Sequence, residues 1–224
     1  MKILITGATG MVGEGVLRTC LEDQNVIEII SLSRRPSGYS HPKLKEVIHN
    51  NMMNIEPVKD WLENIDACFF CLGISSVGIG KAAYFETTYT LTMHIARVVA
   101  GLNPAMSFCY VSGAGTDHTL RSRQQWSRVK GRVEIELHTM FGNRFYAYRP
   151  GFLKPFPESR HVLPFYKFVA WMFPLGRRVF PQGFSTLEEL GKSMLYVTRH
   201  AYEPWILEGL QIRHTAQLYS QKGS

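Results

Sequence analysis

Long apolar runs are missing from this chain of 224 residues. A membrane-spanning helix needs about 18 or more consecutive apolar residues, and no stretch reaches that length, so we expect no integral membrane segment. The first apolar run, residues 3–5, is too short for a secretory signal and leads directly into a glycine-rich turn. We therefore expect a cytoplasmic protein.

Cysteines are also few, and the four present, Cys20, Cys68, Cys71 and Cys109, fit a reducing compartment. Cys68 and Cys71 have the C-x-x-C spacing of redox proteins, but they lie in an apolar run that we expect to form a buried strand. A redox pair normally opens a helix, so we interpret both as small core residues. The eight histidines show no paired spacing with cysteines or carboxylates, and we expect no metal.

Runs of one charge are short as well. The net charge is +7 and the sequence pI is about 9.3, yet the longest basic runs are the pairs Arg34-Arg35 and Arg177-Arg178. A basic balance can indicate nucleic acid, an anionic membrane surface or a phosphorylated ligand. Because the remaining cations are scattered, an anionic cofactor explains the charge more economically. We expect no nucleic-acid partner.

The material for a core is ample, since 45% of the residues are hydrophobic and 19% are charged, which excludes a disordered chain. Short β-rich runs alternate with amphipathic segments. Strands are expected at residues 2–6, 26–33, 44–49, 67–72, 107–112 and 145–149, and helices at 11–22, 58–64, 84–101 and 123–140. This alternation predicts an α/β protein with a Rossmann-like, doubly wound parallel sheet and helices on both faces. The ligand should lie outside the carboxyl ends of the strands.

Residues 152–224 differ from the rest of the chain. Residues 151–183 are rich in proline and aromatics, among them Phe165, Tyr166, Phe168 and Trp171, and the segment 185–188, Ser-Thr-Leu-Glu, resembles a capping box that opens a helix to about Arg199. We interpret 152–224 as a small substrate-side cap within one domain spanning 1–224. The aromatics then serve packing, with a membrane-surface or subunit contact as the alternative, and the chain is a monomer or a homodimer.

The strongest motif is the segment 6–13, Thr-Gly-Ala-Thr-Gly-Met-Val-Gly, which follows the first strand and opens the first helix. Gly7 permits a tight turn, Gly10 lets the backbone approach a pyrophosphate, and Gly13 allows close packing of helix and strand. The free N–H groups at the helix terminus then bind the phosphates. This context predicts dinucleotide binding, with a purely structural turn as the alternative.

The G-x-x-G-x-x-G spacing after Thr6 resembles the atypical, single-domain, NAD(P)-binding epimerase-like branch of the short-chain dehydrogenase/reductase superfamily, over about residues 2–200. Segment 110–114, Tyr-Val-Ser-Gly-Ala, stands where that family has a strand ending in an active-site serine, and segment 126–130, Trp-Ser-Arg-Val-Lys, where it has Tyr-x-x-x-Lys. The resemblance implies a catalytic group at Ser112, Lys130 and Trp126. It implies cofactor contacts from Gly7, Thr9, Gly10, Met11, Val12, Gly13, Leu72, Gly73, Lys130, Pro150 and Gly151.

The choice of cofactor follows from charge at the end of the second strand. An NAD site usually places a carboxylate there for the ribose 2′-hydroxyl, but this chain has Ser33, Arg34 and Arg35. A guanidinium can bind a 2′-phosphate with two hydrogen bonds, and Ser33 can donate another. We therefore expect NADP rather than NAD, with a solvated arginine turn as the alternative.

The chain departs from the family at position 126. In the family that the chain resembles, a tyrosine at this position exchanges the proton. A lysine four residues later lowers the pKa of that tyrosine and binds the nicotinamide ribose. The indole of Trp126 donates a hydrogen bond but does not exchange a proton near neutral pH. Trp126 also continues an apolar stripe, with Val129, Val133, Leu137 and Met140, so it is either core or a stacking partner for nicotinamide or substrate.

Two functions remain open. The chain is an NADP-dependent oxidoreductase or epimerase-like enzyme acting on a small carbonyl or sugar-like substrate, with the proton supplied by water, Ser112, His118 or another group. Alternatively, it is a catalytically inactive dinucleotide-binding redox sensor or scaffold. Asp117, His118, Tyr84 and Tyr89 are the other candidate acids, although surface or packing roles are the simpler interpretation of each.

Overall fold

Seven parallel strands form the central sheet of the computed structural model, which describes residues 1–160 and 173–222. Their order is β3-β2-β1-β4-β5-β6-β9, and every neighbouring pair is parallel. The strands are β1 (Lys2–Thr6), β2 (Glu28–Ser33), β3 (Leu44–Ile48), β4 (Ala67–Phe70), β5 (Ser107–Val111), β6 (Phe145–Arg149) and β9 (Ile206–Glu208). The Rossmann-like α/β fold is thus confirmed, and its strand order reverses between β1 and β4.

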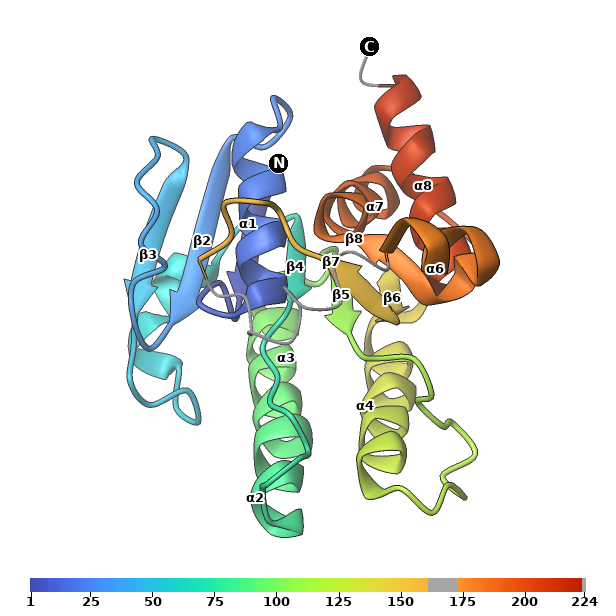
Figure 1. Ribbon diagram of the computed structural model, residues 1–224. Coiled ribbons are helices and arrows are strands. Elements are labelled where there is room, and N and C mark those ends of the chain that lie inside the picture. Colours follow the sequence, from blue (N-terminus) through green and yellow to red (C-terminus); the bar gives the residue numbers. More distant parts are fainter. Residues whose placement is uncertain (161–172, 223–224) are drawn as a thin grey trace.

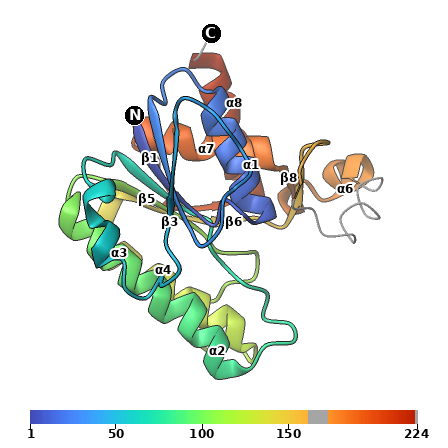
Figure 2. The same cartoon turned by 90° about the vertical axis from the view of Figure 1, so that its left-hand side faces the viewer.

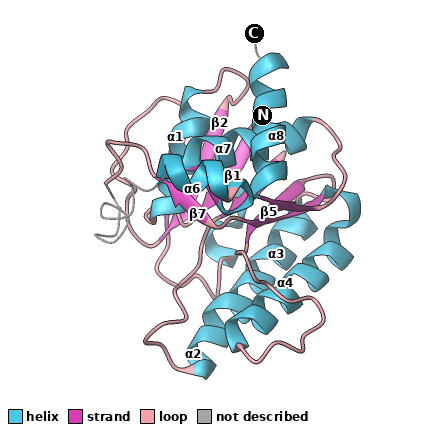
Figure 3. Cartoon of the chain, turned by 45° about the vertical axis from the view of Figure 1, so that its right-hand side comes forward, coloured by secondary structure: helices cyan, strands magenta, loops and turns pink. Residues whose placement is uncertain are grey.

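Helices cover both faces of this sheet, as Figures 2 and 3 show. On one face lie α1 (Met11–Glu22), α7 (Leu187–Arg199) and α8 (Gly209–Lys222), and on the other lie α3 (Leu91–Leu102) and α4 (Gln125–Phe141). Two separate clusters of buried apolar side chains fill the space between the sheet and these two layers. Strand β4 is buried along its whole length, because both of its faces meet a helical layer.

Several boundaries differ from the expected ones for local reasons. The segment expected as a helix at 58–64 is a 3-10 helix, η1 (Glu56–Leu62). It begins two residues earlier than expected, because Pro57 is tolerated in the first turn of a helix. The helix expected at 84–101 begins earlier, as α2 (Lys81–Phe85) and a π-helical turn, η2 (Glu86–Thr90), before α3. The capping box of α7 (Leu187–Arg199) lies one residue later than expected. The Thr186 hydroxyl accepts from the Glu189 N–H, and the Glu189 carboxylate accepts from the Thr186 N–H.

The C-terminal region contributes to the main sheet as well as to a projecting element. The predicted cap range, 152–224, includes β9 and the helices α7 and α8. Helix α7 packs closely on α1 at Gly191. A Cβ on this glycine would lie only 2.7 Å from the side chain of Thr19. What projects from the body is smaller: β7 (Phe152–Lys154), β8 (Phe184–Thr186) and α6 (Phe173–Val179) (Figures 1 and 2). Phe165, Tyr166, Phe168 and Trp171 lie outside the described residues.

Candidate functional site

The loop between β1 and α1 is shaped by three glycines that have different neighbours. Gly7 has a φ of +74°, and a Cβ on it would lie 2.7 Å from the backbone of Cys71 and Leu72. A Cβ on Gly13 would lie 2.1 Å from the Gly7 carbonyl oxygen. Both glycines therefore allow close packing inside the protein. At Gly10 the nearest atom would be 3.5 Å away, so its open side faces solvent rather than protein.

Gly10 is also the N-cap of α1 and caps it without a side chain. The first-turn N–H groups of a helix have no intrahelical partner and carry the positive end of the helix dipole. An anion beside Gly10 would meet these groups with no side chain between them. The geometry of the loop is therefore compatible with the binding of a phosphate or pyrophosphate by backbone N–H groups.

A cavity of about 370 Å³ adjoins this loop. Its lining comes from the end of β2, from the segments after β1, β2, β3 and β4, and from one residue each of η2 and α3. These residues are Gly7, Thr9, Gly10, Leu32, Ser33, Arg34, Arg35, Asn50, Asn51, Met52, Met53, Cys71, Leu72, Gly73, Ile74, Thr87 and Leu91. Eight of the expected cofactor-binding residues therefore surround one cavity. Met11, Val12 and Gly13 form the first turn of α1 beside it.

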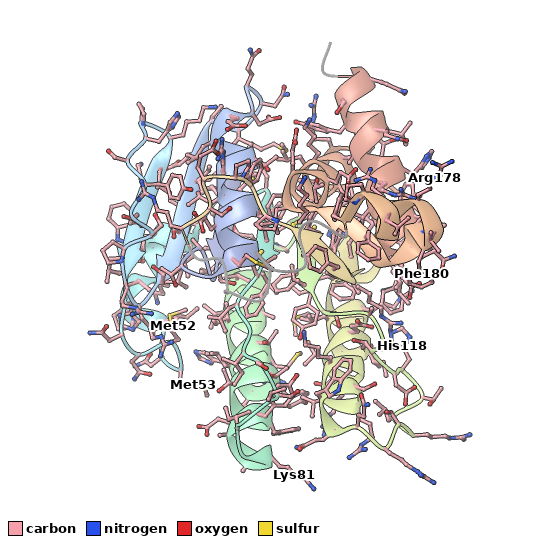
Figure 4. All side chains as sticks on the ribbon, in the orientation of Figure 1. Met52, Met53, Lys81, His118, Arg178 and Phe180 are labelled. Carbon is pink, nitrogen blue, oxygen red and sulfur yellow. The ribbon has the colours of Figure 1, made fainter. Side chains whose placement is uncertain are left out.

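Residues 50–53 after β3 were not among the expected site residues. Their position was available in principle, because they follow a parallel strand at its carboxyl end, where ligands of this fold bind. Figure 4 shows Met52 and Met53 below β2 and β3, toward α3. Met52 is buried, whereas 41% of Met53 is exposed. The polar pair Asn50-Asn51 carried no motif, which is why the sequence did not single it out.

Among the described residues that line this cavity, the charged ones are Arg34 and Arg35, both exposed, and none is a carboxylate. The Ser33 hydroxyl donates to the Arg35 carbonyl at 2.6 Å, and Ser33 is buried. Its proton is thus committed to the turn that carries the two guanidinium groups. The cavity has a cationic end that suits an anionic ligand.

Ser112 and Lys130 meet at the carboxyl end of β5, outside the residues lining that cavity. The Lys130 ammonium donates to the Ser112 carbonyl oxygen at 2.5 Å. Burial lowers the pKa of Lys130 to about 8, although the nearby Glu134 charge opposes this shift. The Ser112 hydroxyl is buried and 2.9 Å from the Thr116 hydroxyl. Ser112 and Lys130 are therefore neighbours, joined through the backbone carbonyl of Ser112 and not through its hydroxyl.

Trp126 lies one turn before Lys130 on α4 and is partly exposed. Its ring packs on the turn at Gly115, where a Cβ would lie 3.4 Å from the indole. The interpretation as core is therefore wrong for Trp126, although Val129, Val133 and Leu137 of the same stripe are buried. The stacking role stays a prediction.

Pro150 and Gly151 follow β6, next to the loop that follows β5. The Pro150 carbonyl accepts a hydrogen bond from the Ala114 N–H at 3.0 Å, which ties it to the loop that follows Ser112. A Cβ on Gly151 would lie 2.5 Å from the Gly183 carbonyl oxygen, so the chain passes close to the projecting element here. Pro150 and Gly151 thus lie beside Ser112, and not at the cavity near the arginines.

A buried ion pair between Glu134 and Arg149, near Ser112, was not predicted from the sequence. Glu134 is completely buried and binds Arg149 through two contacts, Nε–Oε1 at 3.1 Å and Nη2–Oε2 at 2.6 Å. The His118 ring contacts both the Glu134 carboxylate and the Arg149 guanidinium. Burial raises the pKa of Glu134, but hydrogen bonds from His118, Arg149 and Ser112 outweigh it and hold that pKa below its ordinary value. In the sequence, Glu134 could have been noticed only through its spacing of four from Lys130, which places both residues on one helical face.

His118 is further fixed by an aromatic stack. Its ring lies 5.2 Å from that of Trp205, and His138 stacks on Trp205 at 4.4 Å. Figure 4 shows His118 beside α4. His118 is thus part of a packed network, with one ring nitrogen facing an ion pair.

The other candidate acids have structural partners. The Asp117 carboxylate accepts from the Thr119 hydroxyl and from the N–H groups of Thr119, Arg121 and Ser122, which lowers its pKa to about 2. The Tyr89 hydroxyl donates to Glu136 at 2.6 Å, and burial is the main reason that its pKa is raised. Burial likewise raises the pKa of Tyr84. Asp117 stays ionised near neutral pH, and both tyrosines keep their protons.

The two cysteines of the C-x-x-C pair differ. Cys68 is buried in β4, whereas Cys71 follows the strand, is half-buried and lines the cavity, so the interpretation as a core residue is wrong for Cys71. Cys68 and Cys71 are free, burial raises the pKa of Cys71 to about 12, and the pKa of Cys68 is also raised well above its usual value. Within residues 1–160 and 173–222, no group of three or more metal-ligating side chains is arranged to hold an ion. Nor does that part of the chain contain a helix long and apolar enough to cross a membrane.

Solved structures share this fold at low sequence identity. The ADP-L-glycero-D-manno-heptose-6-epimerase of Helicobacter pylori superposes with a TM-score of 0.67 at 15% identity, covering 100% of this chain and 82% of that one. A short chain dehydrogenase from Burkholderia cenocepacia J2315, in complex with NADP, gives a TM-score of 0.66 at 15% identity, covering 98% and 91%. These likenesses establish the fold alone.

Sequence relatives are distant. Protein FMP52, mitochondrial, of Coccidioides immitis (strain RS) is 25% identical over 173 residues, covering 71% of this chain and 68% of that protein. The leucinostatins biosynthesis cluster protein T of Purpureocillium lilacinum is 23% identical over 235 residues, covering 87% and 83%. The family model of the NAD dependent epimerase/dehydratase family matches residues 3–120, more than half of the chain. This chain therefore belongs to the NAD dependent epimerase/dehydratase family.

Proposed function

We propose that this protein is an NADP-dependent oxidoreductase that acts on a small carbonyl or sugar-like substrate. The observation that carries the proposal is the cavity in which the glycine loop at Gly7 and Gly10 is joined to Arg34 and Arg35, with no carboxylate among its described lining residues. The glycine loop would bind a pyrophosphate, and the two arginines would bind a further phosphate. A dinucleotide that bears a 2′-phosphate has both groups.

The residues present fit such a cofactor. The open side of Gly10 leaves a place for a pyrophosphate that a side chain would fill, and α1 begins directly behind it. Arg34 and Arg35 stand at the carboxyl end of β2, where an NAD-binding protein usually has an acid. Charge-assisted hydrogen bonds there should favour NADPH over NADH by about 1–3 kcal/mol.

The carboxyl ends of β5 and β6 supply the other half of the proposed site. We place the nicotinamide and the substrate oxygen near Ser112, Lys130, Pro150 and Gly151, with Trp126 at the rim. Bound NADPH would supply a hydride to the substrate. Lys130 would hold the nicotinamide ribose, and the Ser112 hydroxyl would orient the substrate oxygen.

Trp126 favours a second candidate function, a dinucleotide-binding sensor or scaffold without catalysis. Its indole cannot replace a tyrosine as a proton donor. The two candidates differ in turnover and not in cofactor binding. Consumption of NADPH with a panel of aldehydes, ketones and quinones supports the oxidoreductase, whereas tight binding without turnover on any compound supports the sensor.

The cofactor preference is tested by calorimetry with NADPH and NADH. Wild type should bind NADPH at least about fivefold more tightly, and the double variant Ser33→Asp, Arg34→Ala should narrow or reverse this ratio. Arg178→Ala is the control for the loss of one arginine, because it removes one positive charge from α6, far from Met52 in Figure 4. The preference should weaken as salt is added, since both arginines are exposed. Equal affinity of wild type for the two cofactors would contradict the role of the arginine turn.

A further inference from the structure

The proposed reaction lacks an evident proton donor. Asp117 is held ionised by its hydrogen bonds, and the Tyr89 hydroxyl is bound to Glu136 on the outer part of α4. The ring nitrogen of His118 that points inward is engaged by Glu134 and Arg149. A carbonyl that receives a hydride must nevertheless take up a proton on its oxygen.

We propose that Lys130, whose ammonium stands against the Ser112 carbonyl at the carboxyl end of β5, itself donates that proton in place of the missing tyrosine. This inference rests on the proposed oxidoreductase function. It assigns to Lys130 a direct role in proton transfer, in addition to holding the ribose.

The position of the ammonium suits this role. Among the described residues, the ammonium donates a hydrogen bond to the Ser112 carbonyl oxygen at 2.5 Å, so two of its three N–H bonds can turn toward a ligand. Gly113 adjoins this nitrogen, and even a Cβ there would lie 4.0 Å from it. The Lys130 ammonium therefore lies beside the backbone at Ser112 and Gly113, near which the substrate oxygen is proposed to lie.

The surroundings also make this ammonium a better acid than an ordinary lysine. Burial lowers its pKa to about 8, and the facing charged group that opposes this shift is Glu134, one turn later on α4. Arg149 from β6 and His118 from the loop after β5 hold the Glu134 carboxylate, which limits how far it stabilises the ammonium. A general acid works best when its pKa lies near the working pH. Lys130 is thus protonated at neutral pH and yet able to release its proton.

The proton balance is simple. As the hydride reaches the carbonyl carbon, the C=O π pair moves to oxygen, one N–H bond of Lys130 breaks, and an O–H bond forms. The substrate becomes an alcohol, NADPH becomes NADP⁺, and Lys130 is left as a neutral amine. The amine then takes up a proton from the solvent, so each turnover consumes one solvent proton.

Replacing Lys130 by arginine separates the two roles. A guanidinium keeps the positive charge and can bind ribose hydroxyls, but it does not release a proton in proteins. We expect Lys130→Arg to bind NADPH within about threefold of wild type by calorimetry, while kcat for carbonyl reduction falls by about 10²–10⁴-fold. Lys59→Arg, on the exposed surface at η1, is the matched control and should change neither value. Adding Trp126→Tyr to Lys130→Arg should restore turnover, because a phenol again occupies the donor position.

A second measurement needs no turnover. In protein labelled with ¹³C-lysine, the Cε resonance that disappears in Lys130→Arg should titrate near pH 8, whereas exposed lysines titrate above about pH 10. The kcat of wild type should fall as pH rises through the same value. Titration of Lys130 above pH 10, or Lys130→Arg with more than about a tenth of wild-type kcat, would overturn the proposal for Lys130 while leaving the oxidoreductase function intact. If wild type binds NADPH and reduces no carbonyl compound, the proposed function itself fails.

Discussion

Substitution of Gly10 by aspartate should raise the stability of the protein and destroy its affinity for a dinucleotide. Gly10 has φ −107° and ψ 162°, a conformation open to every residue, and it is the N-cap of α1. Aspartate is among the best N-cap residues, and its carboxylate can accept from the N–H of Val12 or Gly13. These are the groups that a pyrophosphate would bind. The variant would therefore satisfy the helix terminus internally.

The two effects have different sizes as well as opposite signs. The cap contributes a few tenths of a kcal/mol over glycine, and the smaller freedom of the unfolded chain adds about 0.4–1 kcal/mol, so the free energy of unfolding should rise by about 0.5–1.5 kcal/mol. Repulsion between the carboxylate and a phosphate about 4 Å away, at an effective dielectric constant of 20, is up to about 4 kcal/mol. The dissociation constant should rise by up to about a thousandfold.

Calorimetry with NADPH and thermal unfolding of the ligand-free protein measure the two quantities. Gly10→Asn is the matched control for size, because it is nearly isosteric with aspartate and carries no charge; it should cap the helix and weaken binding less, and the difference between the two variants should shrink with salt. Gly13→Ala is the control for packing. Its Cβ would lie 2.1 Å from the Gly7 carbonyl oxygen, so it should lower the melting temperature even without ligand.

Unchanged affinity in a folded Gly10→Asp variant would show that the phosphates do not lie at this loop. Equal losses in the Asp and Asn variants would show that bulk, and not charge, is what the loop excludes. A lower melting temperature for Gly10→Asp would contradict the inference that the side chain faces open space.

Two further predictions concern α4. Trp126→Tyr should raise carbonyl reduction by NADPH above the level that proton transfer from Lys130 supports, because a phenol there shares the helical face of Lys130 and its pKa falls beside an ammonium. A steady-state assay over a panel of small carbonyl compounds checks this, and Lys130→Met should remove the gain; no gain on any compound would mean that more than one residue has diverged. Glu134→Gln should lower the free energy of unfolding by about 3–5 kcal/mol near pH 7, since it leaves the Arg149 guanidinium, only 11% exposed, without its charge partner. Because the folded-state pKa of Glu134 lies below its ordinary 4.5, its stabilisation is present above that pH and lost as pH falls through the folded-state value, so urea unfolding should show the deficit narrowing in acid. A deficit that is independent of pH would contradict the role of ionisation.

The architecture was predictable from local patterns. The apolar runs of β1, β4 and β6 and the glycine turn between β1 and α1 are continuous in sequence, and each carries its own conformational preference. Their alternation then leaves few topologies, because parallel strands need crossover helices. The short strand β9 was missed, since three residues give too little periodicity to distinguish a strand from a loop.

The site was predictable only where its residues are neighbours in sequence. The arginine turn after β2, and the separation of four between Trp126 and Lys130, are read directly from the chain, because a strand end and a helical turn place such residues together whatever else the protein does. The sequence alone therefore indicated a phosphate-binding loop, a cationic cavity end and an absent tyrosine.

The tertiary structure decided which distant groups meet and what that does to their charges. Glu134 reaches Arg149 and His118 across separations of 15 and 16 residues, because the carboxyl ends of β5 and β6 lie side by side once the sheet has formed. The same assembly surrounds Lys130 and lowers its pKa to about 8. Burial and the facing charges set a pKa, and both belong to the packed molecule rather than to any segment of its sequence.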